Sequence, residues 1–152
     1  MSVGHPATFR RTMKQCQKSW VFGLFQFPGI AERWLTEDNW ANFRSWSSHP
    51  DADQVIADLE ATGALTPALN WYWANVPPEW WVSPPWQRPP VQAATMGVWS
   101  TGDFALTEQQ MTDSAENVAD TWRYECLPGP GHWLQLEAPD QVNALLFDFL
   151  PC

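Results

Sequence analysis

Residues 127–139 read Leu-Pro-Gly-Pro-Gly-His-Trp-Leu-Gln-Leu-Glu-Ala-Pro, a polar loop between a short apolar run and an amphipathic segment. Glycines at 129 and 131 permit backbone angles that other residues avoid, and such loops present a side chain at a fixed place. The side chain presented here is His132, and imidazole is the one side chain that ordinarily changes its charge near neutral pH. We therefore expect His132 to be the functional centre of this loop.

The segment 98–103, Val-Trp-Ser-Thr-Gly-Asp, repeats this arrangement upstream. An apolar run is followed by a glycine and then by one carboxylate, Asp103, at the approach to another helix. The sequence predicts strands over 91–99 and 122–127, a helix from the capping box Thr107/Gln110 to about residue 118, and a final helix starting at Pro139. The final helix should bury one face, formed by Val142, Leu145, Leu146 and Phe149.

Two strands separated by a helix must run parallel. The carboxyl ends of parallel strands meet at one edge of the sheet, where open α/β sheets build their sites. We therefore expect the side chains of Asp103 and His132 to lie within direct or water-bridged hydrogen-bonding distance.

The segment from 10 to 76 is predicted to be entirely helical. A helix over 11–26 should stop near Phe27, ahead of Pro28-Gly29. Thr36 is a predicted N-cap for a helix over 37–46, Asp51 for a helix that ends before Gly63, and Thr66-Pro67 opens a helix to about residue 75.

Residues 77–90 contain six prolines and three tryptophans, a composition that sustains neither a helix nor a central strand. This segment is predicted to connect the helical layer to a C-terminal strand-helix-strand-helix part over 91–152. Residues 1–9 resemble the end of a core strand.

Seventeen acidic residues against eight basic ones give a formal charge of -9, which argues against nucleic acid or an anionic membrane as a partner. The three cysteines, Cys16, Cys126 and Cys152, have no metal-ligand spacing, and neither His5 nor His49 suits a metal site. Cys126 is expected to be a buried thiol within a strand. The sequence has no signal-peptide pattern and no long apolar run, so we expect a cytoplasmic protein without metal.

Several motifs taken together resemble the α/β-hydrolases of the epoxide hydrolase and haloalkane dehalogenase type. In chain order these are Ser2-Val3-Gly4-His5-Pro6, the segment 25–32 (Phe-Gln-Phe-Pro-Gly-Ile-Ala-Glu), Leu69-Asn70-Trp71-Tyr72, the segment 97–103, and Gly129-Pro130-Gly131-His132-Trp133 with Glu137-Ala138-Pro139. The resemblance implies a partial α/β-hydrolase fold: a helical cap followed by two parallel strands with flanking helices.

The resemblance also implies roles for individual residues. Asp103 would be the acid and His132 the base of a hydrolytic triad, and Tyr72 the cap tyrosine that donates a hydrogen bond to an epoxide oxygen. Trp71 and Trp133 would line the pocket of a small apolar substrate. The reaction would need no metal or organic cofactor.

Two features depart from the family pattern. Neither a Gly-x-Asp-x-Gly nor a Gly-x-Ser-x-Gly nucleophile elbow occurs in the sequence, and no His-Gly dipeptide offers an oxyanion loop. The second cap tyrosine expected before Phe25-Gln26 is also missing. The chain therefore resembles a hydrolase that lacks its first five strands, and we expect it to be inactive by itself. A small apolar substrate would bind only when an N-terminal half completes the fold.

Two alternatives remain open. A serine esterase of the same fold differs only in the nucleophile that the sequence lacks. A non-catalytic binding module, whose tryptophans hold apolar or sugar ligands, belongs to a different class. If the chain is part of a hydrolase, its two-strand sheet should have a bare edge, through which the chain is expected to self-associate.

Overall fold

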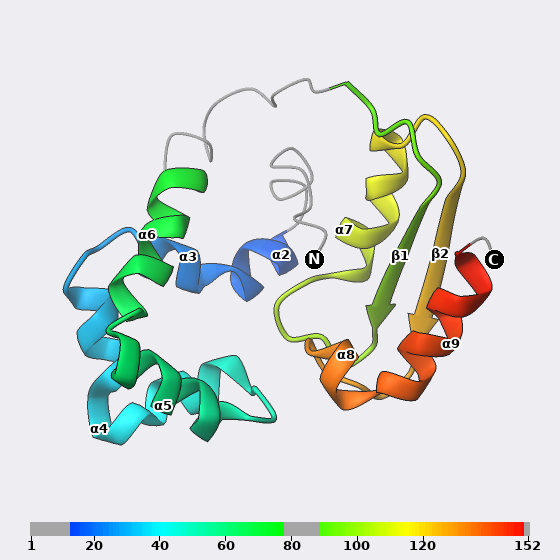
Figure 1. The fold of residues 1–152 in the computed structure, drawn as a ribbon. Helices are drawn as coiled ribbons and strands as arrows, with labels where there is room; N and C mark the ends of the chain where they lie inside the picture. Colours follow the sequence, from blue (N-terminus) through cyan, green and yellow to red (C-terminus); the bar gives the residue numbers. More distant parts are fainter. Residues whose placement is uncertain (1–12, 78–88, 151–152) are drawn as a thin grey trace. The chain divides into compact units, whose positions relative to one another are not determined.

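The computed structural model describes residues 13–77 and 89–150, which form two compact units. The helical unit comprises the described residues from Trp20 to residue 77, and the strand unit comprises residues 13–19 and 89–150. Figure 1 shows the elements of each unit. The strand end predicted for residues 1–9 and most of the Pro/Trp-rich connection (residues 78–88) lie outside the described residues.

The helical unit consists of α3 (Trp20–Leu24), α4 (Ile30–Ser47), α5 (Ala52–Thr62) and α6 (Leu65–Asn75). Its core is apolar and strongly aromatic. Ring contacts such as Phe25 with Trp46, at 5.3 Å between centroids and nearly perpendicular planes, have the edge-to-face geometry that aromatic pairs prefer. The buried core residues are Val21, Phe25, Ala31, Leu35, Trp40, Phe43, Ile56 and Leu69.

The predicted helix start at Thr36 is wrong. α4 begins at Ile30, where the carboxylate of Glu32 reaches back to accept the amide of Gly29 at 2.6 Å, and the Thr36 hydroxyl donates to the carbonyl of Glu32 within the helix. Helical angles are interrupted at residues 37–40, three of which have positive φ. The helix is therefore interrupted close to the predicted boundary at Thr36. The interruption is a kink within α4, however, and not a new helix capped by the Thr36 side chain.

α5 confirms the helix predicted between Asp51 and Gly63. Asp51 occupies the N-cap position without a side-chain cap bond, and Gly63 takes the left-handed conformation (φ 64°) beyond the last turn. α6 starts at Leu65, one residue before the predicted Thr66-Pro67 opening, and ends at Asn75 as expected. The Thr66 hydroxyl donates instead to Glu32 at 2.9 Å.

The continuous helix predicted over 11–26 is divided. Within the described residues it forms α2 (Met13–Lys18) and α3, separated at Ser19. The division has a physical basis in the hydrogen bonds of Gln15, described below, which belong to the strand unit, whereas Val21 belongs to the core of the helical unit.

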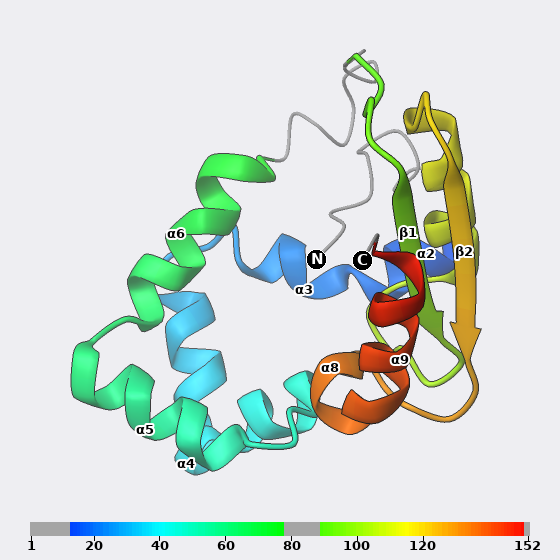
Figure 2. The ribbon, with the colours of Figure 1, turned by 45° about the vertical axis from the view of Figure 1, so that its right-hand side comes forward.

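The strand unit contains β1 (Thr95–Ser100) and β2 (Trp122–Leu127), which are parallel as predicted, with Thr95 opposite Trp122 and Ser100 opposite Leu127. α7 (Glu108–Thr112) and a 3₁₀-helix, η2 (Asp113–Asn117), connect them, and α8 (Leu134–Glu137) and α9 (Pro139–Phe149) follow. In Figures 1 and 2 the strand pair lies between α7 and α9.

The boundaries predicted for this unit are partly confirmed. The second strand and the Pro139 helix start agree with the structure, whereas the first strand begins four residues late, at Thr95, and residue 91 only bridges to Val118. Thr107 caps α7 by accepting the amide of Gln110 at 3.4 Å, but the α-helix ends at Thr112 and tightens into η2. The four-residue helix α8 was not predicted.

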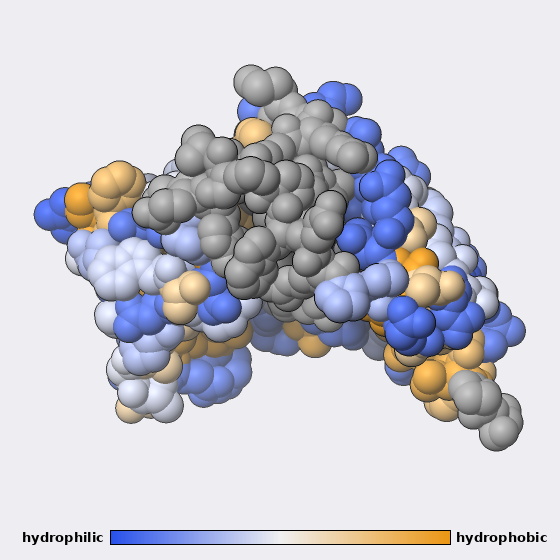
Figure 3. All heavy atoms as spheres, turned by 90° about the horizontal axis from the view of Figure 1, so that it is seen from above, coloured by the Kyte–Doolittle hydropathy of each residue, from blue (hydrophilic) through white to orange (hydrophobic). Residues whose placement is uncertain are grey.

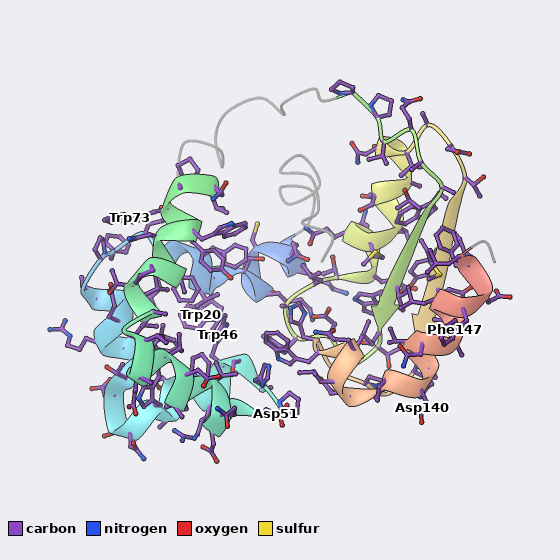
Figure 4. All side chains as sticks on the ribbon, in the orientation of Figure 1. Trp20, Trp46, Asp51, Trp73, Asp140 and Phe147 are labelled. Atoms are coloured by element: carbon purple, nitrogen blue, oxygen red, sulfur yellow. The ribbon has the colours of Figure 1, made fainter. Side chains whose placement is uncertain are left out.

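One burial prediction is wrong and another is confirmed in part. Cys126 is exposed. On α9 three of the four residues of the predicted face, Val142, Leu145 and Phe149, are partly buried, whereas Leu146 is 41% exposed and none is fully buried. Phe147, outside that face, is 80% exposed. Phe147 is labelled on α9 in Figure 4, and Figure 3 shows hydrophobic residues gathered beside the C-terminal end. Within the described residues the sheet has two strands, so its face is too small to bury the whole stripe of α9, and β2, which carries Cys126, has one edge without a strand partner.

Candidate active site: an Asp–His pair at the ends of two parallel strands

Asp103 is fixed by the turn that follows β1. Its amide donates to the carbonyl of Ser100 at 3.2 Å. Its Oδ1 atom accepts the amides of Ala105 at 2.7 Å and Leu106 at 2.9 Å, a side-chain turn typical of aspartate. The carboxylate is 7% exposed, so its orientation is set by these bonds rather than by water.

His132 follows β2 on a loop that is tied to the Asp103 turn. The amide of Gly102 donates to the carbonyl of Pro130 at 3.1 Å, and a Cβ at 102 would lie 2.5 Å from that same oxygen. Gly129 has φ 106°, which confirms the expected conformational role of this glycine. Gly131 does not have positive φ, so its role in backbone freedom is not confirmed.

The two side chains meet as predicted. Nδ1 of His132 lies 3.1 Å from both Oδ1 and Oδ2 of Asp103. When Nδ1 carries the proton it donates to the carboxylate, and Nε2 then has a free lone pair that can accept a proton. The arrangement is that of a general base oriented by an acid.

Burial alone would favour the uncharged form of Asp103. The hydrogen bond from His132 outweighs it, together with the amides that the carboxylate accepts and the charge that the imidazole acquires on protonation. The pKa of Asp103 is consequently held below its ordinary value of 3.8. The residue is therefore ionised at neutral pH, as an orienting acid must be.

Two aromatic rings of the strand unit lie beside the imidazole of His132. The ring of Phe104 lies 5.3 Å from that of His132, tilted by 59°, and the ring of Trp133 lies 5.3 Å away and nearly perpendicular. The structure thus brings Trp133 together with the Asp–His pair. Phe104 was missed because a phenylalanine after a turn aspartate carries no signal of its own.

The helix α2 supports residues 100–106, the turn that holds Asp103 and that we call the acid turn. Gln15 is fully buried; its Oε1 accepts the amide of Thr107 at 2.9 Å and its Nε2 donates to the carbonyl of Ala105 at 2.8 Å. The Lys18 ammonium donates to the carbonyl of Asp103 itself. Sequence reasoning missed both residues, since only the folded chain reveals such distant partners.

Tyr72 and Trp71 belong to the helical unit, on α6. The ring of Tyr72 packs against Phe25 at 4.9 Å and Phe22 at 5.1 Å, and burial raises the pKa of its phenol. Tyr72 therefore remains protonated and able to donate over the physiological range. Trp71 is 48% exposed and contacts Tyr72 edge to face.

The sequence is similar to curated epoxide hydrolases. Epoxide hydrolase 3 of Xenopus tropicalis is 32% identical over 170 aligned positions, which cover 99% of this chain and 44% of the relative. Epoxide hydrolase A of Mycobacterium tuberculosis is 31% identical over 110, which cover 72% of this chain and 34% of the relative. The chain is a relative of the epoxide hydrolases.

This epoxide hydrolase relative carries part of the α/β-hydrolase fold. One similar solved structure is an epoxide hydrolase of the α/β-hydrolase superfamily found in metagenomes from hot environments. The match covers 99% of this chain and 55% of the solved chain, with a TM-score of 0.75 and 21% sequence identity. The chain spans less than half the length of the two curated relatives above. No family model matches the sequence. Among the described residues, no helix has the length and apolar character needed to cross a membrane.

Proposed function

We propose that this chain supplies the acid and the base of an epoxide hydrolase-type active site. The observation that carries the proposal is the bond between His132 Nδ1 and the buried Asp103, which leaves Nε2 as the proton acceptor. In this assignment His132 takes a proton from water while Asp103 stabilises the imidazolium that forms.

The reaction implied for such a site has two steps. A nucleophilic carboxylate opens the epoxide by attacking carbon, which forms an alkyl ester and leaves an alkoxide that takes up a proton. Water that gives a proton to His132 then attacks the carbonyl carbon of the ester, and the bond between that carbon and the diol oxygen breaks. The departing alkoxide takes the proton from the imidazolium, and the regenerated carboxyl group releases the proton that restores the donor used in the first step. The base is needed for the second step.

The nucleophile belongs, in this proposal, to a segment outside these 152 residues. No Gly-x-Asp-x-Gly or Gly-x-Ser-x-Gly elbow occurs in them. A base without a nucleophile turns nothing over, so the chain alone should be inactive. An aspartate at the missing elbow would give epoxide chemistry, and a serine would make the complete protein an esterase.

Tyr72 is proposed to donate its phenolic proton to the epoxide oxygen, since burial keeps it protonated. Trp71 of the helical unit and Trp133 of the strand unit are each proposed to contact an apolar substrate. A proton donor that meets the developing alkoxide lowers the barrier to ring opening by neutralising its charge.

The test combines this chain with the part of Xenopus tropicalis Epoxide hydrolase 3 that the alignment leaves uncovered. Styrene oxide and p-nitrophenyl acetate are the probes, and the chain alone is the negative control. We expect epoxide opening only in the combined protein, with a loss of at least about 100-fold in steady-state turnover on His132→Ala. Turnover by the chain alone that disappears with His132→Ala would contradict the proposal.

A second candidate rests on the exposed tryptophans of the helical unit. Trp20 is 51% exposed and Trp73 43%, whereas Trp46 packs into the aromatic core (Figure 4). Exposed indoles can stack apolar or sugar ligands. Quenching of tryptophan fluorescence by oligosaccharides, without quenching by small epoxides, would favour this binding function.

A further inference from the structure

The carboxylate of Glu137 holds the backbone on both sides of His132. Its Oε2 accepts the amide of Gly131 at 2.6 Å, and its Oε1 accepts the amide of Trp133 at 3.1 Å. Hydrogen bonds to an ionised acceptor are stronger than neutral ones, so this two-point contact restrains the loop from its exposed side.

The same loop is held from the buried side by Ser100. This residue, the last of β1, is fully buried, and its hydroxyl donates to the carbonyl of Gly131 at 2.7 Å. The residue before His132 is thus fixed at its amide by one side chain and at its carbonyl by another. These bonds fix the position of the His132 backbone, from which the imidazole reaches Asp103.

Gly131 provides the space that the carboxylate occupies. A Cβ at position 131 would lie 2.9 Å and 3.0 Å from the two oxygens of Glu137, which is tighter than an ordinary contact, so the carboxylate would have to move away. Since Gly131 does not have positive φ, room for Glu137 explains this glycine better than backbone freedom does.

We propose that Glu137 is a positioning residue for His132, which holds the loop so that Nδ1 faces Asp103 and Nε2 faces the substrate side. The inference rests on the proposed function of the Asp–His pair and adds to it a second carboxylate, that of Glu137, which touches no reacting atom. The simpler interpretation is a helix cap, because Trp133 is the N-cap of the four-residue α8. A cap would affect stability without affecting the ring of His132.

The experiment measures the tautomer of His132 by ¹⁵N NMR of the full chain labelled at histidine, at pH 8. The chain has three histidines, and His132→Ala assigns the signal. We expect the Nδ1–H tautomer in the wild type and a mixture of tautomers in Glu137→Gln. Hydrogen exchange at the amides of residues 131 and 133 should become about tenfold faster, the change expected for the loss of a charge-assisted bond.

Two further variants make the test specific. Gly131→Ala should reproduce the effect without changing Glu137, because its methyl group displaces the carboxylate. Asp140→Asn is the matched control: Asp140 is another exposed acid, at the start of α9 (Figure 4), and its removal should leave the tautomer and both exchange rates unchanged.

The outcomes separate the two proposals. If the wild type lacks a preferred Nδ1–H tautomer, the Asp–His pair itself is refuted. If the wild type has it and both Glu137→Gln and Gly131→Ala retain it with unchanged exchange rates, the pair stands and the positioning role of Glu137 is wrong. A lower melting temperature without a change of tautomer would assign Glu137 as a helix cap alone.

Discussion

Gln15 accepts the amide of Thr107 at 2.9 Å across 92 residues of sequence. Thr107 is the N-cap of α7, and the expected capping box would have Gln110 bond this amide. Gln15 takes that place, and its amide group also holds the carbonyl of Ala105. One buried side chain therefore connects α2 to both the acid turn and the start of α7.

Replacing Gln15 with leucine should be strongly destabilising. The substitution leaves the amide of Thr107 and the carbonyl of Ala105 without their partner, at about 1–3 kcal/mol for each group that stays buried. Urea unfolding should show a midpoint shifted to lower concentration with little change in slope. Gln17→Leu, at an exposed position on the same helix, is the control and should shift the midpoint little. Equal effects of both variants would mean that the Gln15 bonds contribute no stability.

Gly102→Ala should separate the acid turn from the histidine loop. The new methyl group would lie 2.5 Å from the carbonyl oxygen of Pro130 and 2.9 Å from that of Gly129, and these backbone atoms cannot rotate away. We expect a cost of about 1–3 kcal/mol, as for other overpacked sites, together with loss of the Asp103–His132 bond. Gly63→Ala is the comparison, because φ 64° is strained for alanine but no atom lies within 4 Å of its Cβ. It should lower the melting temperature and leave the histidine signal unchanged.

The stability of the chain should depend on Asp103 in acid. The pKa of its carboxyl is lowered in the folded state, so its contribution is present above the ordinary value of 3.8 and is lost as the pH falls through the lower folded value. The stability difference between wild type and Asp103→Asn should therefore be constant above about pH 5 and narrow below pH 4. Denaturant titrations at pH 7, 4 and 3 test this. A difference that widens in acid would show that the pKa is raised instead.

The chain alone should self-associate. Within the described ranges the sheet has two strands, so each strand has an edge without a strand partner, and Phe147 and Leu150 of the C-terminal end are exposed. Bare edges and apolar surface favour pairing between chains. Sedimentation velocity should show oligomers or aggregates that decrease with Phe147→Ser. A monodisperse monomer would instead indicate a self-sufficient domain and favour the binding function.

Much of the strand unit follows from its sequence. Glycines mark both loops, the two apolar runs predict the strands, and the helix between them predicts a parallel pair. The contact between Asp103 and His132 could therefore be anticipated. The helix between Asp51 and Gly63 follows in the same way from its cap and its terminal glycine.

The supporting residues could not be anticipated, for physical reasons. Gln15, Lys18 and Ser100 act through hydrogen bonds to residues far away in the sequence, and no local pattern encodes such partners. The exposure of Cys126 and of Leu146 depends on how many strands surround them. The kink at residues 37–40 contains Trp40, which is buried and whose indole donates to Glu60 at 2.7 Å, a partner that lies twenty residues away and that no local pattern encodes.

The central claim is that His132 activates water for the second step, on a nucleophile that another segment supplies. Mass spectrometry of the combined protein with His132→Ala, after mixing with styrene oxide, tests it most directly. We predict a stable adduct of one epoxide on the complementing segment, because the ester forms and its hydrolysis is blocked, whereas the protein with His132 intact should show none after the epoxide is consumed. An adduct on this chain, or release of diol at an unchanged rate without His132, would contradict the account.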